Sequence, residues 1–157
     1  MDTITNRTFD EIQIGDSHQR IHTVREQDIQ LFAAVSGDRN PVHLDTEYAA
    51  TTPFKAQIAH GMYTGALISA VLGMDLPGPG TIYLGQNIAF KKPVYVGDEL
   101  TVQLTVDSKH DSKPIVTLAC TVSNQKGKTV ASGEATAMAP TEKISVTAPP
   151  LPAIQLS

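Results

Sequence analysis

The chain has 157 residues, which suits one domain with a real hydrophobic core but is short for two independent ones. Its 12 Lys and Arg against 16 Asp and Glu give a formal charge of -4, and no basic run could hold a phosphate backbone, so we expect no nucleic-acid ligand. No apolar stretch approaches the roughly 18–20 residues of a membrane span, and residues 1–7 are polar rather than signal-like, so we expect a cytoplasmic protein without a membrane partner.

The N-terminal third is predicted to hold a strand followed by a helix. Residues 19–24 alternate weakly between polar and apolar side chains, which indicates a short strand. Thr23 and Glu26 have the spacing of a capping box, and apolar residues then recur at helical intervals. Gly37 suits the position just beyond a helix end, so we expect a helix over 24–36.

A short, stiff loop follows that helix and has the sequence Asp-Arg-Asn-Pro-Val-His over residues 38–43. Pro41 disfavours the helical conformation at Asn40, so the loop cannot simply continue the helix. It therefore holds a carboxylate, Asp38, and an imidazole, His43, five residues apart, where both could converge on one water.

The segment over 60–72 is predicted to be a buried central helix. It is apolar or small on nearly every side and carries no charge, so other elements must cover it. It begins with His60 and Gly61, and the first turn of a helix leaves backbone N–H groups free to meet developing negative charge.

The second half is predicted to be a set of antiparallel strands. Strands are expected over 81–94, 99–106, 115–123 and 129–139, where β-favouring residues are bounded by turn residues. Short polar connections join the last three strands, which favours hairpins over parallel units. The fold class is therefore α+β, with the sheet covering the helix over 60–72.

The C-terminal residues 140–157 are rich in proline and show little apolar periodicity. Such a segment is expected to be extended and largely unpacked, as a linker or a loose end. The folded domain is predicted to occupy residues 1–139.

The loop and the helix start together suggest one chemistry. Singly, each has an ordinary interpretation, since Gly-Asp often ends helices and Asn-Pro often begins turns. Hydration of an enoyl thioester, however, needs a base that deprotonates water attacking C3 and donors for the enolate oxygen forming at C1. Asp38 and His43 could serve the first need, and the N–H of Gly61 the second.

The loop also resembles a known family. Residues 32–43 are similar to the hydratase motif of MaoC-like (R)-specific enoyl-CoA hydratases, at each polar position of that motif. The likeness covers roughly 9–139, and its further matching segments are 48–54, 60–62, 76–86 and 93–98.

The resemblance implies a hot-dog fold, in which a long antiparallel sheet wraps around a central helix at about 60–72. It also implies a homodimer that binds the CoA thioester in a tunnel near the subunit interface. Asp38 and His43 would activate water there, giving an (R)-3-hydroxyacyl-CoA in a reversible reaction with no cofactor apart from the CoA of the substrate. Which of the two is acid and which is base stays open, because a coupled pair exchanges these roles with direction.

Other residues receive supporting roles. Asn40 is expected to shape the loop or orient a catalytic partner, because an amide is a poor proton shuttle. Gly61 is expected to supply the oxyanion N–H, since glycine allows the thioester carbonyl to approach closely. Ser69 and Leu72 are candidates for the wall of the acyl pocket, and Ser69 suggests limited depth and short or medium chains.

The remaining histidines and two lysines carry weaker expectations. His60 is expected to be structural, because the resemblance gives it no catalytic role. Lys91 and Lys92 could meet CoA phosphates as point charges, or could simply form a solvated strand end. Three histidines among polar neighbours are expected at the surface: His18, His22 and His110.

No metal is expected. Asp38, His43, Asp45 and His60 could in principle surround an ion, but no helical ligand spacing supports such a site. The single cysteine, Cys120, lies in an apolar strand pattern and is predicted to be a small buried hydrophobe.

Three alternatives remain open. A thioesterase or a 3-hydroxyacyl dehydratase acting on a carrier protein could use the same fold and acyl-thioester pocket, and a non-catalytic module could bind acyl-CoA without turnover. Residues 139–144 and the prolines that follow resemble the linker after hydratase-like domains fused to phosphate acyltransferases, so a fused or associated acyltransferase is a possible partner.

Overall fold

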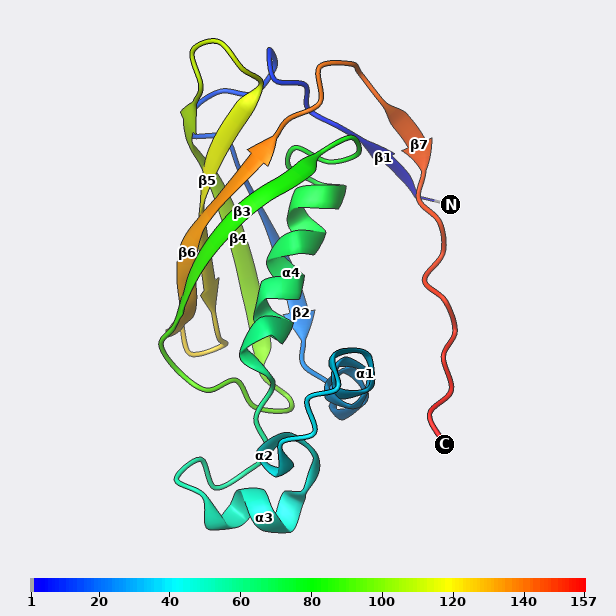
Figure 1. Ribbon diagram of the computed structural model, residues 1–157, viewed down its shortest axis with the longest axis vertical. Coiled ribbons are helices and arrows are strands. Elements are labelled where there is room, and N and C mark those ends of the chain that lie inside the picture. The colour runs from blue at the N-terminus through cyan, green and yellow to red at the C-terminus, as the bar shows by residue number, and fades with distance from the viewer. Residues whose placement is uncertain (1) are drawn as a thin grey trace.

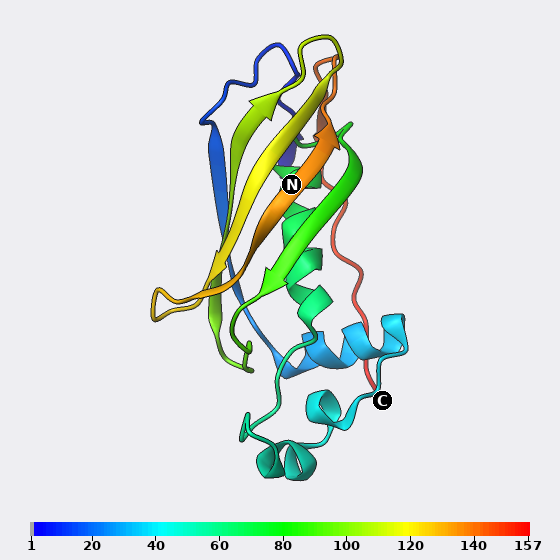
Figure 2. The same ribbon diagram turned by 60° about the vertical axis from the view of Figure 1, so that its left-hand side comes forward.

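A five-stranded antiparallel sheet wraps around one long helix (Figures 1 and 2). The structure is a computed structural model and describes residues 2–157. The helix is α4 (Gly61–Met74), and it lies along one face of the sheet. Across the sheet the strands run in the order β2 (Ser17–Thr23), β4 (Glu99–Lys109), β5 (Ile115–Ser123), β6 (Thr129–Met138) and β3 (Ile82–Phe90). The predicted α+β hot-dog architecture is confirmed.

The strands agree with the sequence-based prediction except at their ends. β4, β5 and β6 form the expected meander, whereas β3 crosses to the outer edge of β6. β3 stops at Phe90 rather than at 94, because the N–H groups of Lys91 and Lys92 both turn to the carbonyl oxygen of Val130 (2.8 and 3.2 Å). Pro93 then has no N–H to offer a ladder. The chain after β3 is thereby freed to line a pocket.

The core lies between α4 and the inward-facing side of the sheet. On α4, Ile68, Val71 and Leu72 are fully buried, and along β4 and β5 every second residue is buried, as at Leu104 and Leu118. This is the period-two pattern of a strand with one face covered. Cys120 also lies in this core, 1% exposed, as the sequence predicted. The expected burial of α4 is met on the side that faces the sheet, whereas Met62, Ala66 and Ser69 on its other side are exposed in the single chain.

β3 and β6 approach each other unusually closely at one position. A Cβ atom built on Gly133 of β6 would lie 2.0 Å from the carbonyl oxygen of Asn87 on β3, so only glycine fits there. Farther along the same pair, the register shifts between Tyr83 and Gly85. Such irregularities bend a strand and increase its twist, which lets the edge of the sheet curl around α4.

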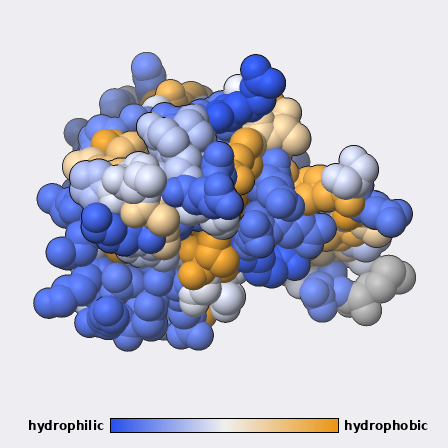
Figure 3. Space-filling model, turned by 90° about the horizontal axis from the view of Figure 1, so that it is seen from below, coloured by the Kyte–Doolittle hydropathy of each residue, from blue (hydrophilic) through white to orange (hydrophobic). Residues whose placement is uncertain are grey.

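Three shorter helices lie at and below the lower end of α4 (Figures 1 and 2). They are α1 (Glu26–Ser36), α2 (Pro41–Leu44) and α3 (Thr46–Thr51). Seen from this end, the surface is mostly hydrophilic around a smaller hydrophobic area (Figure 3). The outer side of these helices is therefore solvated. On the inner side, α2 carries His43.

α1 begins with a different cap from the one the sequence suggested. The Asp28 carboxylate accepts hydrogen bonds from the N–H and the guanidinium of Arg25 (3.4 and 2.7 Å). The predicted pair, Thr23 and Glu26, is not used, because Thr23 is still the last residue of β2. The helix ends as predicted at Gly37, which has φ 81 and donates its N–H to Ala33 at 2.9 Å.

The chain termini form a small two-stranded ribbon of their own. β1 (Thr3–Thr5) pairs with β7 (Ser145–Thr147), and the side chain of Asn6 donates to the carbonyl of Glu142 at 2.9 Å. Lys143 pairs with Glu11 at 2.9 Å. The prediction of an unpacked segment from residue 140 onward is therefore wrong for residues 140–147, which are bonded to the N-terminal segment.

Residues 148–157 continue as an extended chain that passes α1 (Figure 1). Nearly all of them are exposed, and the carbonyl of Ile154 accepts a hydrogen bond from Gln27 of α1 at 3.4 Å. Leu156 and Ser157 share a pocket of about 510 Å³ with residues of α1 and with Gly37 and Arg39. Among the helices of residues 2–157, none has the length and apolar character needed to cross a membrane.

Candidate active site

The loop from Gly37 to His43 is held by its own side chains. The Asp38 carboxylate accepts from the N–H of Asn40 at 3.0 Å, and the Asn40 side chain in turn accepts from the N–H of Val42 at 3.2 Å. Asn40 is thus the N-cap of α2, and Pro41 occupies its first turn, where a missing N–H costs nothing. These bonds give Asn40 the loop-shaping contact that the sequence predicted for it.

His43 lies on α2 with only 8% of its surface exposed. Its Nδ1 is 2.7 Å from the carbonyl oxygen of Ile58, and a carbonyl can only accept, so Nδ1 carries the hydrogen. In the neutral ring Nε2 then keeps its lone pair and is free to take a proton. Gln57 donates to the carbonyl of His43 at 2.9 Å and ties the same segment down again.

Asp38 and His43 are brought to the same place by a third residue, His60. The rings of His43 and His60 are stacked, with centroids 3.8 Å apart and planes inclined by 24°. His60 Nε2 lies 3.0 Å from the carbonyl oxygen of Asp38. His60 also packs on Phe32 of α1, with ring centroids 4.9 Å apart and planes inclined by 50°. The predicted pair therefore shares one cluster with a histidine that the sequence left outside the site.

This cluster has the composition of a metal site without its geometry. One possible ligand atom from each of Asp38, His43 and His60 lies within 4.8 Å of the others. Imidazole nitrogens bind metals in the plane of the ring, and two stacked rings direct their lone pairs along nearly parallel planes rather than toward one ion. Nδ1 of His43 and Nε2 of His60 are also already bonded to carbonyl oxygens. The geometry argues against a bound ion, and the absence of a metal stays a prediction.

Gly61 is the first residue of α4 and faces a pocket of about 420 Å³. Among residues 2–157, no acceptor lies within bonding distance of its N–H, as expected in the first turn of a helix. A Cβ atom at this position would lie 3.0 Å from the ring of Phe90. The N–H is accessible at the pocket because the residue is glycine, which suits the predicted oxyanion role.

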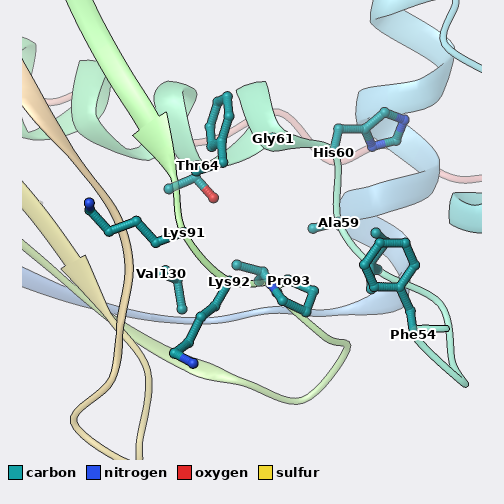
Figure 4. Close-up of a pocket in the computed structure, with 12 residues that line it drawn as sticks. Phe54, Ala59, His60, Gly61, Thr64, Lys91, Lys92, Pro93 and Val130 are labelled. Atoms are coloured by element: carbon teal, nitrogen blue, oxygen red, sulfur yellow. The ribbon is translucent and has the colours of Figure 1, made fainter.

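Most of the pocket wall comes from two segments, and Val130 of β6 completes it (Figure 4). One leads into α4, and the other follows β3. They are joined where Ala59 N–H donates to Val94 O at 2.8 Å. Its lining residues are Phe54, Ile58, Ala59, His60, Gly61, Thr64, Phe90, Lys91, Lys92, Pro93, Val94 and Val130.

Lys91 and Lys92 are exposed at the side of the pocket away from His60 (Figure 4). Two ammonium groups at the edge of a largely apolar pocket could meet phosphates of a bound CoA, as the sequence suggested. Both side chains are also well solvated, so the choice between the two predicted roles stays open.

Ser69 and Leu72 do not line this pocket. Leu72 is 1% exposed and belongs to the core, whereas Ser69 lies on the exposed side of α4. Their assignment to the acyl-pocket wall stays a prediction. The sequence did not suggest Phe54, Thr64 or Phe90, since none of them belongs to a recognisable catalytic pattern.

His22 is a correction to the expected surface histidines. It is half-buried, and its Nε2 lies 2.6 Å from the hydroxyl of Tyr63 and 3.2 Å from the carboxylate of Asp28. Burial and the neighbouring Asp28 raise the pKa of Tyr63 well above its ordinary value. Burial also raises the pKa of Asp28, but hydrogen bonds from Arg25 and Tyr63 outweigh it, and the net pKa is lowered. This polar group fixes β2, α1 and α4 behind Phe32.

The sequence is similar to known hydratases and dehydratases that act on acyl-CoA. Residues 11–129 match the model of the MaoC like domain family. An (R)-specific enoyl-CoA hydratase of Rhodospirillum rubrum is 48% identical over 134 residues, which cover 84% of this chain and 91% of that protein. A 3-hydroxybutyryl-CoA dehydratase of Methylorubrum extorquens is 43% identical, with 73% of each chain covered.

Solved structures agree as well. The R-hydratase PhaJ1 from Pseudomonas aeruginosa, in its unliganded form, superposes with a TM-score of 0.96 at 52% identity, over 99% of this chain and 100% of that one. An (R)-hydratase from Aeromonas caviae involved in PHA biosynthesis superposes with a TM-score of 0.81 at 42% identity, over 82% of this chain and 98% of that one.

Proposed function

Because the chain belongs to the MaoC-like domain family, we propose that it hydrates trans-2-enoyl-CoA thioesters to (R)-3-hydroxyacyl-CoA, and catalyses the reverse dehydration. One structural observation supports the proposal most directly. Asp38 and the free Nε2 of His43 belong to one cluster, and that cluster adjoins the first turn of α4 and its pocket. The chain is thus a carbon–oxygen lyase.

The chemistry needs both members of the pair. One of them takes a proton from water as its oxygen attacks C3, and the electron pair of the double bond moves toward the thioester oxygen. The other delivers a proton to C2 on the same face, so that one water is added in all and the thioester bond survives. His43 can accept through Nε2, and an ionised Asp38 accepts through its free oxygen. We assign the reaction to the pair as a unit.

The enolate that forms between these two events needs stabilisation. A thioester carbonyl in the pocket can point its oxygen at the N–H of Gly61, at the positive end of α4. Donors fixed in advance at the site of developing charge act without reorganisation, and a helix start supplies them at no conformational cost. The proposed reaction needs no cofactor or metal apart from the CoA of its substrate.

We propose further that the protein works as a homodimer. The outer edge of the sheet is β3, whose backbone groups are unpaired on that side and whose side chains Ile82, Leu84 and Phe90 are 55%, 49% and 51% exposed. Exposed apolar sheet edges are commonly covered by another chain. Asp38 is also exposed in the single chain, and a covering copy would exclude bulk water from it. Sedimentation velocity would report a species of twice the chain mass.

Two expectations from the sequence stay predictions. A phosphate acyltransferase as fused or associated partner has only the resemblance of residues 139–144 in its support. A cytoplasmic location likewise has only the sequence in its favour.

The decisive assay follows the ultraviolet absorbance of the conjugated thioester when crotonyl-CoA is mixed with the purified protein. We expect wild-type protein to remove the absorbance, and Asp38→Asn to be slower by about two to four orders of magnitude, since it removes a group that exchanges a proton. Chiral analysis of the product should give the (R)-3-hydroxy acid.

The same assay separates the alternatives. Release of free thiol from crotonyl-CoA would indicate a thioesterase, because hydration leaves that bond intact. Turnover only of a carrier-protein thioester would indicate a carrier-dependent dehydratase. Binding of crotonyl-CoA with no turnover would overturn the enzymatic proposal in favour of a binding module.

A further inference from the structure

His60 touches both members of the catalytic pair without belonging to it. Its Nε2 is 3.0 Å from the backbone oxygen of Asp38, and its ring is stacked 3.8 Å from that of His43. It is 3% exposed and stands immediately before Gly61, at the start of α4. One side chain thus connects the carboxylate loop, the imidazole and the proposed oxyanion N–H.

The hydrogen bonds fix the tautomer of His60. Because a carbonyl oxygen cannot donate, Nε2 must carry the hydrogen that Asp38 O accepts. Nδ1 is buried and has no partner among residues 2–157. Through Nε2, His60 therefore serves as a donor to Asp38, and its ring presents an aromatic face to His43.

His60 is badly placed to exchange protons with substrate. Its Nε2 is committed to Asp38, and its Nδ1 has no accessible surface to offer. His43, by contrast, has Nδ1 committed to Ile58 and Nε2 free. The two stacked imidazoles thus have different tasks, in spite of their similar chemistry.

We propose that His60 is a positioning residue for the reaction, an inference that rests on the hydratase function proposed above. Its hydrogen bond holds the backbone of Asp38 in position, and its stacked ring holds the imidazole of His43. Together the two contacts fix the distance between the Asp38 carboxylate and Nε2 of His43. Phe32 packs on the same His60 ring, with centroids 4.9 Å apart. A shift of about 1 Å between groups that hold one water can cost on the order of 100-fold in rate.

Two substitutions divide these contacts. His60→Gln keeps an N–H donor for Asp38 and removes the ring, whereas His60→Phe keeps a ring on His43 and removes the donor. We expect both to lower kcat for crotonyl-CoA hydration by roughly 10- to 100-fold while KM changes by less than about threefold, since His60 is one lining residue of the pocket and all the others are unchanged. Thermal unfolding of each variant is measured beside its kinetics.

Val71→Ala is the matched control for a loss of packing. Val71 is fully buried on the same helix but contacts neither the loop nor the pocket. We expect Val71→Ala to lower Tm and to leave kcat within about twofold of wild type, because its effect is confined to core packing. The double variant Asp38→Asn with His60→Gln should be no slower than Asp38→Asn alone, because groups that act as a unit are not additive.

Several results would overturn the proposal. They are a kcat within about twofold of wild type in either His60 variant, an equal loss of kcat in Val71→Ala, or losses that multiply in the double variant. Failure of both His60 variants to fold would also overturn it, by making His60 a requirement of the fold. If the wild-type protein itself does not hydrate crotonyl-CoA, it is the proposed function that fails, so the two failures are distinguishable.

Discussion

Gly61 has a hydrogen atom in place of a side chain, and this affects both its backbone N–H and its distance from Phe90. Its N–H belongs to the first turn of α4, beside the pocket. Its Cα lies so close to the ring of Phe90 that an added methyl group would come within 3.0 Å of the ring. The phenyl ring is half exposed and lines the pocket, so a shift of the ring would change the shape of the pocket beside the N–H. A side chain at this position would therefore narrow the route to the N–H without unfolding the helix.

Gly61→Ala should lower kcat/KM for crotonyl-CoA by about 10- to 1000-fold, because it hinders a donor of the kind whose loss costs 100- to 1000-fold. Gly73→Ala is the control on the same helix, where an added Cβ meets nothing within 4 Å. That change should leave kcat/KM unaltered and stabilise the protein by up to about 1 kcal/mol. Equal activities for the two variants would contradict the role of Gly61.

The proximity of Asp38 and His43 could be expected from the sequence, whereas their surroundings could not, and their catalytic role stays a prediction. Asp38, Asn40 and His43 lie in one short loop, whose turn chemistry limits its conformations and so brings them together. His60 meets Asp38 across 22 positions of the chain, and its stacking on His43 depends on how α4 enters the fold. Local spacing contains no information about such a contact, and His60 was accordingly expected to be only structural.

The antiparallel pair β3 and β6 leaves no room for a side chain at one position. Gly133 faces the backbone of Asn87, where a Cβ would lie 2.0 Å from the carbonyl oxygen and 2.9 Å from the Cα of Ile88. Unlike a ring edge, backbone on a paired strand cannot rotate away. β3 also brings Phe90 and the lysines after it to the pocket, so this contact helps to set the pocket wall.

Gly133→Ala should therefore destabilise the protein by about 3 kcal/mol or more, through overpacking against backbone. Urea unfolding measures the change. Gly85→Ala, on β3 itself, is the control, since its added Cβ would meet nothing within 4 Å. If Gly133→Ala lowers the free energy of unfolding by no more than Gly85→Ala does, the two strands must separate easily.

Element positions were predictable from periodicity, and element ends were not. The alternation in β4 and β5 and the uncharged apolar run in α4 are long signals that survive local variation. The start of α1 and the end of β3 each depend on a pair of local hydrogen bonds, from Arg25 to Asp28 and from Lys91 and Lys92 to Val130. Alternatives such as Thr23 with Glu26 look equally good in sequence.

At the scale of the whole molecule, both ends of the chain are joined on one side of the fold. Lys143 donates to both carboxylate oxygens of Glu11, and the hydroxyl and N–H of Thr8 reach the same carboxylate. These bonds, first of all the one from Lys143, lower the pKa of Glu11 to about 2. The ion pair is exposed, so its effect is local rather than a large share of the stability.

Acidification should loosen this connection before the fold is lost. Because the folded pKa of Glu11 lies below its ordinary value of 4.5, the contact stabilises above that pH and is lost as pH falls toward about 2. Carboxyl chemical shifts from NMR would give the titration of Glu11. Lys143→Met should move its midpoint upward toward 4.5, and an unchanged midpoint would show that Lys143 is not the cause.

The pairing of the two termini could not be seen in the sequence. Residues 145–147 are a short polar and apolar alternation among prolines, and their partner lies at residues 3–5. A strand of that length is recognised only with its partner beside it. The proline content correctly suggested an extended chain for the C-terminal residues. It gave no sign of the hydrogen bonds and the ion pair that join this segment to Asn6 and Glu11.

The loop over 37–43 holds itself in shape through Asp38, Asn40 and Pro41, whereas the pocket is built by the start of α4 and the chain after β3. The two parts meet at His43, which bonds to Ile58 and stacks on His60, and both of these residues line the pocket. A replacement loop would have to keep these contacts in order to act on a thioester held in the same pocket. The reaction is therefore decided by the loop and the start of α4 together, rather than by the loop alone.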